Sequence, residues 1–259
     1  MSTIWIIAKG TFGEAMRRRI LNVFLFVALA LIIMAFAFSS FEPRQELVLI
    51  KGLGLSVILL AGVFISVILS INLLPIEIER RTIYSILSKP VQRYEFLCGK
   101  FLGGLLTVLA NVGLMALAFI ALLTIKEHSL DTSVIKGIVM NAFQLLMVCA
   151  LGVTFSVMMT PFVNFFLTFS IYFLGSISTV WASLATDDGK HSLLTVYFFK
   201  FVHLTLPNFD NFNVQNSIIH PDVHITNEQV YIAQCIGYAI AYSAALLLVA
   251  TFVFDRREV

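Results

Sequence analysis

Two short stretches of the chain carry residues whose types and spacing could do chemistry. The first is His220-Pro221-Asp222-Val223-His224, where imidazole and carboxylate donors lie close together. Such donors can bind a divalent metal ion. Pro221 argues against a regular helix face, and a third firm ligand is not evident. We therefore expect a solvated polar loop and no metal site.

The second stretch, Glu77 to Phe101, is crowded with charge in a chain that is only 12% charged. Apolar side chains recur at helical spacing between Ile83 and Leu87, just after a cluster of acidic and basic residues. Acidic residues in a first turn suit the positive end of a helix dipole. Pro90 ends this predicted helix near Ser88, because proline cannot donate an intrahelical hydrogen bond and restricts the residue before it. A second apolar stripe then leads into the next hydrophobic segment.

Two functions fit a short amphipathic helix of this kind. It could seat its apolar side in a groove of a cytoplasmic partner protein. It could equally anchor a loop at the membrane surface, with basic side chains extended to lipid phosphates. Amphipathicity predicts both functions, so the residues alone leave the choice open.

The elements that position these stretches are membrane spans. The chain has 259 residues, of which 59% are hydrophobic, whereas soluble domains are about one quarter charged. A spanning helix needs roughly 20 apolar residues, so several spans fit but a large additional soluble domain does not. The predicted spans are Ile20–Ser40, Gly52–Leu74, Cys98–Ile125, Val134–Met159, Phe165–Leu184 and Val230–Phe254.

The distribution of basic residues predicts the orientation. Six spans place both termini on one side of the membrane. With the termini inside, the cytoplasmic segments hold 11 of the 17 Lys and Arg residues, as the positive-inside rule requires. We therefore predict a multi-pass membrane protein, N-in and C-in, with Lys100 as an anchor at the cytoplasmic interface.

The remaining segments flank or connect the spans. Residues 1–19 are predicted to form a helix in the cytoplasmic interface, or alternatively to lengthen the first span. Residues 185–229 form the longest loop, which should be external. The run Leu193–Leu206 within it is too short and too polar to span, so we expect re-entrant or interfacial helices. No linker divides the chain, and residues 1–259 form a single transmembrane domain.

The polar content of the spans weighs against several functions. Proton-coupled transport and intramembrane proteolysis need buried acids, histidines or metal ligands, and the most polar residues deep in the spans are Asn111, Asn141, Gln144 and Gln234. The spacing of Cys98, Cys149 and Cys235 indicates structural thiols. Gly99 and Gly103 permit close helix packing, and a dimer contact there is an open alternative. Nothing in the composition supports nucleic-acid binding.

The charged stretch resembles the signature of ABC-2 type transporter permeases. That signature has an E-x-E-x-G-T start, a leucine-rich turn, an S-x-P-[VIL]-x-R break and a final G-K-F/L. The matching residues are Glu77, Glu79, Thr82, Leu87, Ser88, Pro90, Val91, Arg93, Gly99, Lys100 and Phe101. The ending Phe254 to Glu258 also resembles the C-terminus of the family. Arg81 departs from the pattern, because the family usually has glycine there. Within the family, the chain is similar to small permeases of the NosY kind.

The resemblance implies an all-α membrane subunit of an ATP-driven exporter, with six transmembrane helices in the ABC-2, type V exporter-like fold. Residues 77–97 would be the coupling region that docks on a separate ATP-binding subunit. The residues expected to contact it are Glu77, Glu79, Arg80, Arg81, Thr82, Ile83, Ile86, Leu87, Ser88, Pro90 and Arg93. The chain has no G-x-x-x-x-G-K-[ST] loop, so ATP and magnesium are expected in the partner, with no cofactor and no catalysis in this chain.

The resemblance also implies partners. Two ATP-binding subunits would bind a dimer formed with a second copy of this permease or with a paralogous permease, surrounded by membrane lipid. An alternative function is mechanotransmission or sensing, in which the subunit couples ATP hydrolysis to a periplasmic partner without a transport path. A polytopic membrane enzyme is a third alternative, disfavoured because no catalytic constellation is visible.

Overall fold

The computed structural model describes residues 3–39, 46–71, 73, 92–127, 131–184, 193–213 and 227–256. Within these ranges the secondary structure is helical, with no strand. The predicted all-α fold class is therefore confirmed. Most of the predicted coupling region, residues 77–91, lies outside the described residues.

Long helices make up the body of the molecule. They are α1 (Thr3–Met16), α2 (Arg19–Ser39), α3 (Glu46–Ile71), α6 (Arg93–Glu127), α7 (Thr132–Met158) and α12 (Glu228–Arg256). Five of the described helices, all of these except α1, are long and apolar enough to cross a membrane. They coincide with five of the six predicted spans, which makes the chain a multi-pass membrane protein.

The fifth predicted span is a bent pair of helices. Helix α8 (Pro161–Ser176) begins with proline at its first turn, where the missing N–H costs no hydrogen bond. Helix α9 (Ser178–Leu184) follows after a bend of 60°. The pair is thus either a broken span or a re-entrant element. Beyond it lie α10 (Leu193–Thr205) and the short 3-10 helix η1 (Asp210–Phe212).

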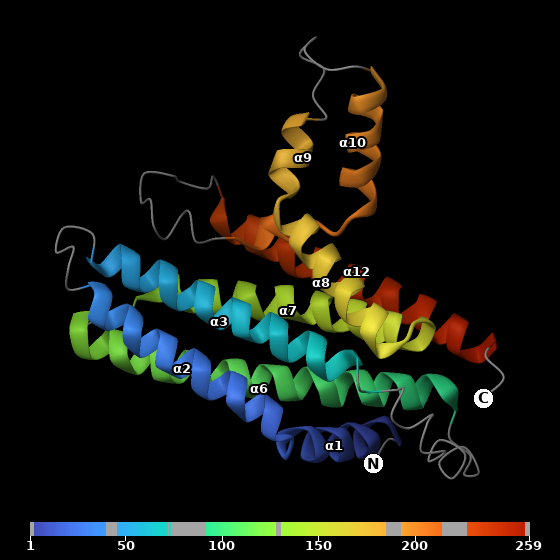
Figure 1. The fold of residues 1–259 in the computed structure, drawn as a ribbon, viewed down its shortest axis with the longest axis horizontal. Coiled ribbons are helices and arrows are strands. Elements are labelled where there is room, and N and C mark those ends of the chain that lie inside the picture. Colours follow the sequence, from blue (N-terminus) through green and yellow to red (C-terminus); the bar gives the residue numbers. More distant parts are fainter. Residues whose placement is uncertain are drawn as a thin grey trace.

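The helices pack as a bundle around α3, which contacts α2, α6, α7 and α8, while α12 packs mainly on α7 (Figure 1). Fully buried aliphatic side chains of α3, such as Ile58 and Val63, fill the centre of this core. Helices α9 and α10 stand away from the bundle as a hairpin, and Trp181 stacks on Phe199 between them at 5.5 Å.

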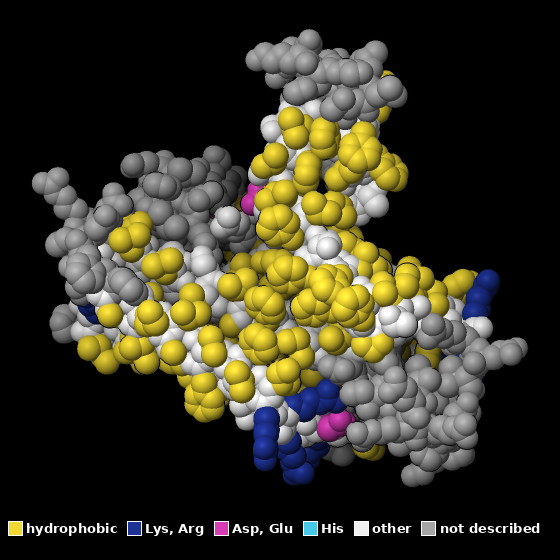
Figure 2. Space-filling view, viewed as in Figure 1, with side chains coloured by type: hydrophobic (Ala, Val, Ile, Leu, Met, Phe, Trp, Pro, Cys, Tyr) yellow, Lys and Arg dark blue, Asp and Glu magenta, His cyan; other side chains and the backbone are white. Residues whose placement is uncertain are grey.

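Apolar side chains cover much of the face seen in Figure 2, including the hairpin. Phe166 and Phe173 of α8 and Phe201 of α10 are exposed, as expected where lipid rather than water surrounds the helices. Lys and Arg side chains gather where α1 meets α2 and again near the C-terminus.

Helix α1 packs lengthwise on the first half of α6. An ideal Cβ at Gly103 would lie 2.6 Å from the carbonyl oxygen of Ala8 and 2.6 Å from Cβ of Thr11, so only glycine allows this approach. In the described residues, α1 therefore packs against α6 at Gly99 and Gly103. A break at Arg17 and Arg18 separates α1 from α2. The depth of α1 relative to the lipid stays a prediction.

Lys100 differs from the sequence-based expectation. Its side chain is buried, with only 6% of the residue exposed, and its ammonium group lies 5.8 Å from the centre of the Phe96 ring. A cation over an aromatic face is stabilised by the ring quadrupole. Lys100 therefore packs inside the α6 end of the bundle and does not extend to the surface as an anchor.

Candidate functional site

The structure places only one residue of the predicted partner contact. Glu77, Glu79, Arg80, Arg81, Thr82, Ile83, Ile86, Leu87, Ser88 and Pro90 lie outside the described residues. Arg93 is described and begins α6. The contact of this region with an ATP-binding subunit stays a prediction, as does the solvated loop at His220–His224, which also lies outside the described ranges.

Arg93 joins the start of α6 to the end of α12. Its Nη1 donates to the carbonyl oxygens of Phe254 at 2.9 Å and Asp255 at 3.3 Å. The guanidinium group also lies 5.9 Å from the centre of the Phe254 ring, which stacks on Phe96. A cation at a helix C-terminus satisfies the last carbonyl groups and interacts favourably with the helix dipole. Movement at the start of α6 therefore reaches α12 directly.

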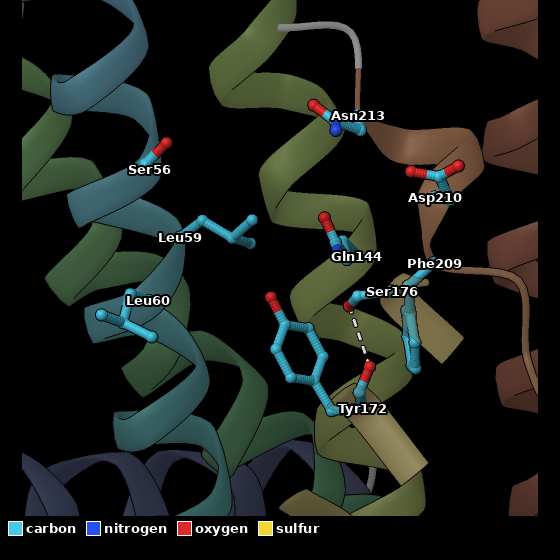
Figure 3. Close-up of a pocket in the computed structure, with 9 residues that line it drawn as sticks. All are labelled: Ser56, Leu59, Leu60, Gln144, Tyr172, Ser176, Phe209, Asp210 and Asn213. Carbon is cyan, nitrogen blue, oxygen red and sulfur yellow. Dashed lines mark hydrogen bonds between the residues drawn. The ribbon is translucent and has the colours of Figure 1, made fainter. Parts of the chain in front are cut away.

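A second candidate region lies inside the bundle, where residues 206–213 run as irregular backbone and η1. We call it the 206–213 segment. Its η1 contacts α7. Gln144 of α7 is a neighbour (Figure 3), and this glutamine lies about 18 Å from the start of α7 at 1.5 Å per residue. The segment thus enters the bundle to about half the length of α7.

The backbone of the 206–213 segment is held by hydrogen bonds to two helices, α8 and α12. The Phe209 N–H donates to the Gly175 carbonyl at 3.1 Å, and the Asn208 N–H donates to the Tyr238 hydroxyl at 3.1 Å. The Tyr231 hydroxyl donates to the Asn211 carbonyl at 2.7 Å. Irregular backbone at membrane depth is tolerated only where it is buried in protein or lines a water-filled cavity. These hydrogen bonds show that the backbone of the 206–213 segment is buried in protein.

Two aromatic anchors and one glycine fix the position of the segment. Phe209 and Phe212 are both fully buried, against Tyr172 and Tyr238 respectively. A Cβ at Gly175 would lie 2.3 Å from the Pro207 carbonyl oxygen, so the close approach requires glycine at this position.

The segment forms one wall of a cavity of about 290 Å³. Helices α3, α7 and α8 supply the other walls (Figure 3). The lining residues are Ser56, Leu59, Leu60, Gln144, Tyr172, Ser176, Phe209, Asp210 and Asn213. In Figure 3 the Tyr172 ring extends into the cavity from α8, while Ser176 donates a hydrogen bond to the Tyr172 carbonyl at 2.8 Å. The lining of this one cavity therefore combines hydroxyl, amide and carboxylate groups with two aromatic residues.

Among the residues that the structure describes, Asp210 is the one carboxylate in the lining of this cavity. The other acidic residues in the described ranges lie in the first or last turns of the long helices or just beside them. Asp210 instead stands beside the middle of α7, and no described side chain forms an ion pair or hydrogen bond with its carboxylate. A carboxylate at membrane depth is costly and marks a functional site.

The polar residues of the spans divide into two groups. Asn111 and Asn141 are structural: their amide groups donate to the carbonyl oxygens of Thr107 at 2.8 Å and of Leu55 at 3.1 Å. Gln144 lines the cavity, and Gln234 lines a smaller one beside Asn211 and Tyr231. Within the described ranges no group of three or more His, Cys, Asp or Glu residues could hold a metal ion.

Sequence reasoning identified Gln144 as one of the most polar residues of the spans but did not bring it together with the 206–213 segment. The available signal was the alternation of Phe209 and Phe212 with Asn and Asp residues. That alternation fits a segment with a buried apolar side and a polar side. The contribution of Tyr172 and Ser56 had no such signal, because single hydroxyl groups are common in apolar helices.

The bundle and its cavity define a multi-pass membrane protein that could hold a small ligand between its helices. The model of the family described as ABC-2 family transporter protein matches residues 5–259. The chain therefore belongs to the ABC-2 family and is a permease-type membrane subunit of an ABC transporter, as its charged stretch predicted. Among curated proteins, no sequence matches it significantly.

Proposed function

We propose that this chain is the membrane subunit of an ATP-driven exporter in a bacterial inner membrane, N-in and C-in. A separate ATP-binding subunit, present in two copies and carrying ATP and magnesium, docks on residues 77–97. Two permease subunits form the complete membrane domain. The observation that carries this proposal is the family match over residues 5–259.

The geometry around Arg93 supports the coupling part of the proposal. Helix α6 continues without a break from Arg93 to Glu127, so a force applied before Arg93 acts on a single rigid rod of about 52 Å. The bonds from Arg93 to the end of α12 transmit the same force to a second span. ATP-driven movement of the docked subunits would therefore tilt α6 and α12 together and change which side of the membrane is exposed.

Export is favoured over mechanotransmission by the polar cavity. A subunit that only relays movement needs a sealed, well-packed interior, whereas a transported molecule needs a space with groups that can recognise it. The cavity beside Gln144 and Asp210 is such a space.

The coupling proposal is tested by substitution in the predicted contact. The ATP-binding subunit that we expect to be encoded beside this chain is co-purified with it in mild detergent, and ATPase activity is compared between the complex and the isolated ATPase. Glu79→Ala combined with Thr82→Ala should reduce coupled ATPase activity about tenfold, corresponding to about 1.4 kcal/mol of coupling free energy, while membrane insertion stays intact.

A matched control uses the same residue types elsewhere. Glu14→Ala combined with Thr205→Ala changes exposed residues of α1 and α10 and should leave coupled ATPase activity near the wild-type value. Wild-type coupling in the Glu79 and Thr82 variant would contradict the assignment of the coupling region.

A further inference from the structure

The cavity beside the 206–213 segment combines three features that recognise one kind of ligand. The first is the Asp210 carboxylate, which lies at about half the length of α7 without a described cationic partner. A carboxylate without a paired cation attracts a cationic ligand. Lys51 and Lys136, the lysines of α3 and α7, pair with acids at the ends of the helices.

The second feature is an aromatic ring. The half-buried Tyr172 lines the cavity, and the fully buried ring of Phe209 packs against it, with ring centroids 5.4 Å apart and planes inclined at 51°. The faces of aromatic rings attract organic cations, and quaternary ammonium groups are the ligands most often bound in this way.

The third feature is the size and polarity of the space. A volume of about 290 Å³ is close to that of ten water molecules at about 30 Å³ each. An ammonium group with a short polar chain fits this volume. The side chains of Gln144, Ser56 and Asn213 can exchange hydrogen bonds with a hydroxyl or ester group next to the cation, while Leu59 and Leu60 contact its apolar part.

We propose that this cavity binds the ammonium group of an organic cation, with Asp210 as the counter-ion and the Tyr172 ring, which packs on Phe209, as the aromatic surface. Gln144 binds the polar group next to the cation. Within the permease, this site selects cationic molecules for transport, a role that rests on the proposed function. Binding of the cation does not depend on the ATP-binding subunit. Cation binding and the proposed export function are therefore tested separately.

The test measures choline binding to the full chain alone, in nanodiscs of phosphatidylglycerol and without nucleotide, by isothermal titration calorimetry. The neutral carbon isostere 3,3-dimethylbutan-1-ol is the matched ligand. Choline should bind at least about tenfold more tightly than the isostere, which is about 1.4 kcal/mol. Equal binding of the two, or no measurable binding of choline, would overturn the proposal whether or not the chain couples to an ATPase.

Three substitutions assign the site. Asp210→Asn should weaken choline binding about tenfold, whereas Asp255→Asn, the same change at an exposed position, should not alter it. Tyr172→Phe should retain choline binding because it keeps the ring, and Tyr172→Leu should weaken it about fivefold. Unchanged binding in both Asp210→Asn and Tyr172→Leu would place choline elsewhere and overturn the assignment.

The ammonium group could belong to a lipid head group or to a soluble cation. Changing the lipid composition of the nanodiscs distinguishes these two sources. If nanodiscs that also contain phosphatidylcholine suppress the binding of free choline, the site takes a lipid head group. If they do not, the site takes a soluble cation. Both outcomes support the recognition of an ammonium group by Asp210, and they differ only in the molecule that carries it.

Discussion

The two ends of the helical bundle are held together by different interactions. At one end, where α3, α7 and α12 begin and α6 ends, lysines pair with acids from other helices. Lys51 donates to Glu127 at 3.0 Å and to Asp131 at 2.7 Å, Lys126 pairs with Glu46, and Lys136 pairs with Glu228 at 2.7 Å. We call this the ion-paired end. Its pairs connect all four helices.

At the opposite end the contacts between helices involve backbone, aromatic rings and glycine. Arg93 binds the last carbonyl groups of α12, and α1 packs on α6 at Gly103. In the described part of the chain, Lys9, Arg17 and Arg19 pair with no carboxylate, and Arg18 pairs within its own segment with Glu14. These cations remain available to anionic lipid, as the predicted cytoplasmic side requires.

The difference suggests that the two ends of the bundle have different mechanical roles, one rigid and one mobile. Ion pairs that share one lysine are directional and resist sliding, so the ion-paired end acts as a fixed point. Burial opposes ionisation of the Asp131 carboxyl, but hydrogen bonds from Lys51 and from the Ser133 backbone outweigh it and hold the pKa of this carboxyl below its usual value. The charges of this end are therefore maintained, while the opposite end carries the predicted coupling region and is free to tilt.

The largest expected effect comes from removing the central cation of the ion-paired end. Lys51→Met leaves Glu127 and Asp131 without their shared partner in a mostly buried site and should lower the free energy of unfolding by about 3 kcal/mol. Unfolding is followed in detergent micelles by tryptophan fluorescence. Lys126→Met removes a more exposed pair and should cost less than about 1 kcal/mol.

Two further substitutions test whether the loss of stability in Lys51→Met comes from the unpaired charges. Adding Glu127→Gln and Asp131→Asn to Lys51→Met removes the unpaired charges, so most of the lost stability should return. A triple variant as unstable as Lys51→Met would show that the lysine stem, and not its charge, holds this end together.

A smaller effect is expected where α1 packs on α6. Gly103→Leu introduces a side chain against Ala8 and Thr11 and should cost about 2 kcal/mol through overpacking, or displace α1. Hydrogen exchange of residues 3–16 measures the displacement. Gly113→Leu on the same helix is the matched control, because a Cβ there has no neighbour within 4 Å. Equal exchange in the two variants would argue against close packing of α1.

The smallest effect is expected at the junction of α6 and α12. Arg93→Met removes the bonds to the Phe254 and Asp255 carbonyls and should cost about 1 kcal/mol, with faster hydrogen exchange in the last turn of α12. Arg256→Met serves as the control, since that side chain stacks on Phe252 at the same helix end. If Arg256→Met accelerates exchange as much as Arg93→Met, the junction is not specific to Arg93.

The spans were predictable from the sequence because hydrophobic length is a local property. Five predicted spans coincide with helices, and the remaining one, Phe165–Leu184, is apolar enough but bends at Ile177. A hydropathy average cannot register a bend, since it weighs composition and not direction. The same limit applies to Lys100, whose burial depends on the Phe96 ring beside it.

Composition and pattern alone determined that this protein lies in a membrane, how long its helices are and which family it resembles. Those properties depend on neighbours in the sequence. The tertiary structure alone decided that Lys51 links three helices, that Gly103 receives α1, and that Asp210, Tyr172 and Gln144 line one cavity. These contacts join residues far apart in the chain, and only the packing of the helices sets which polar groups meet.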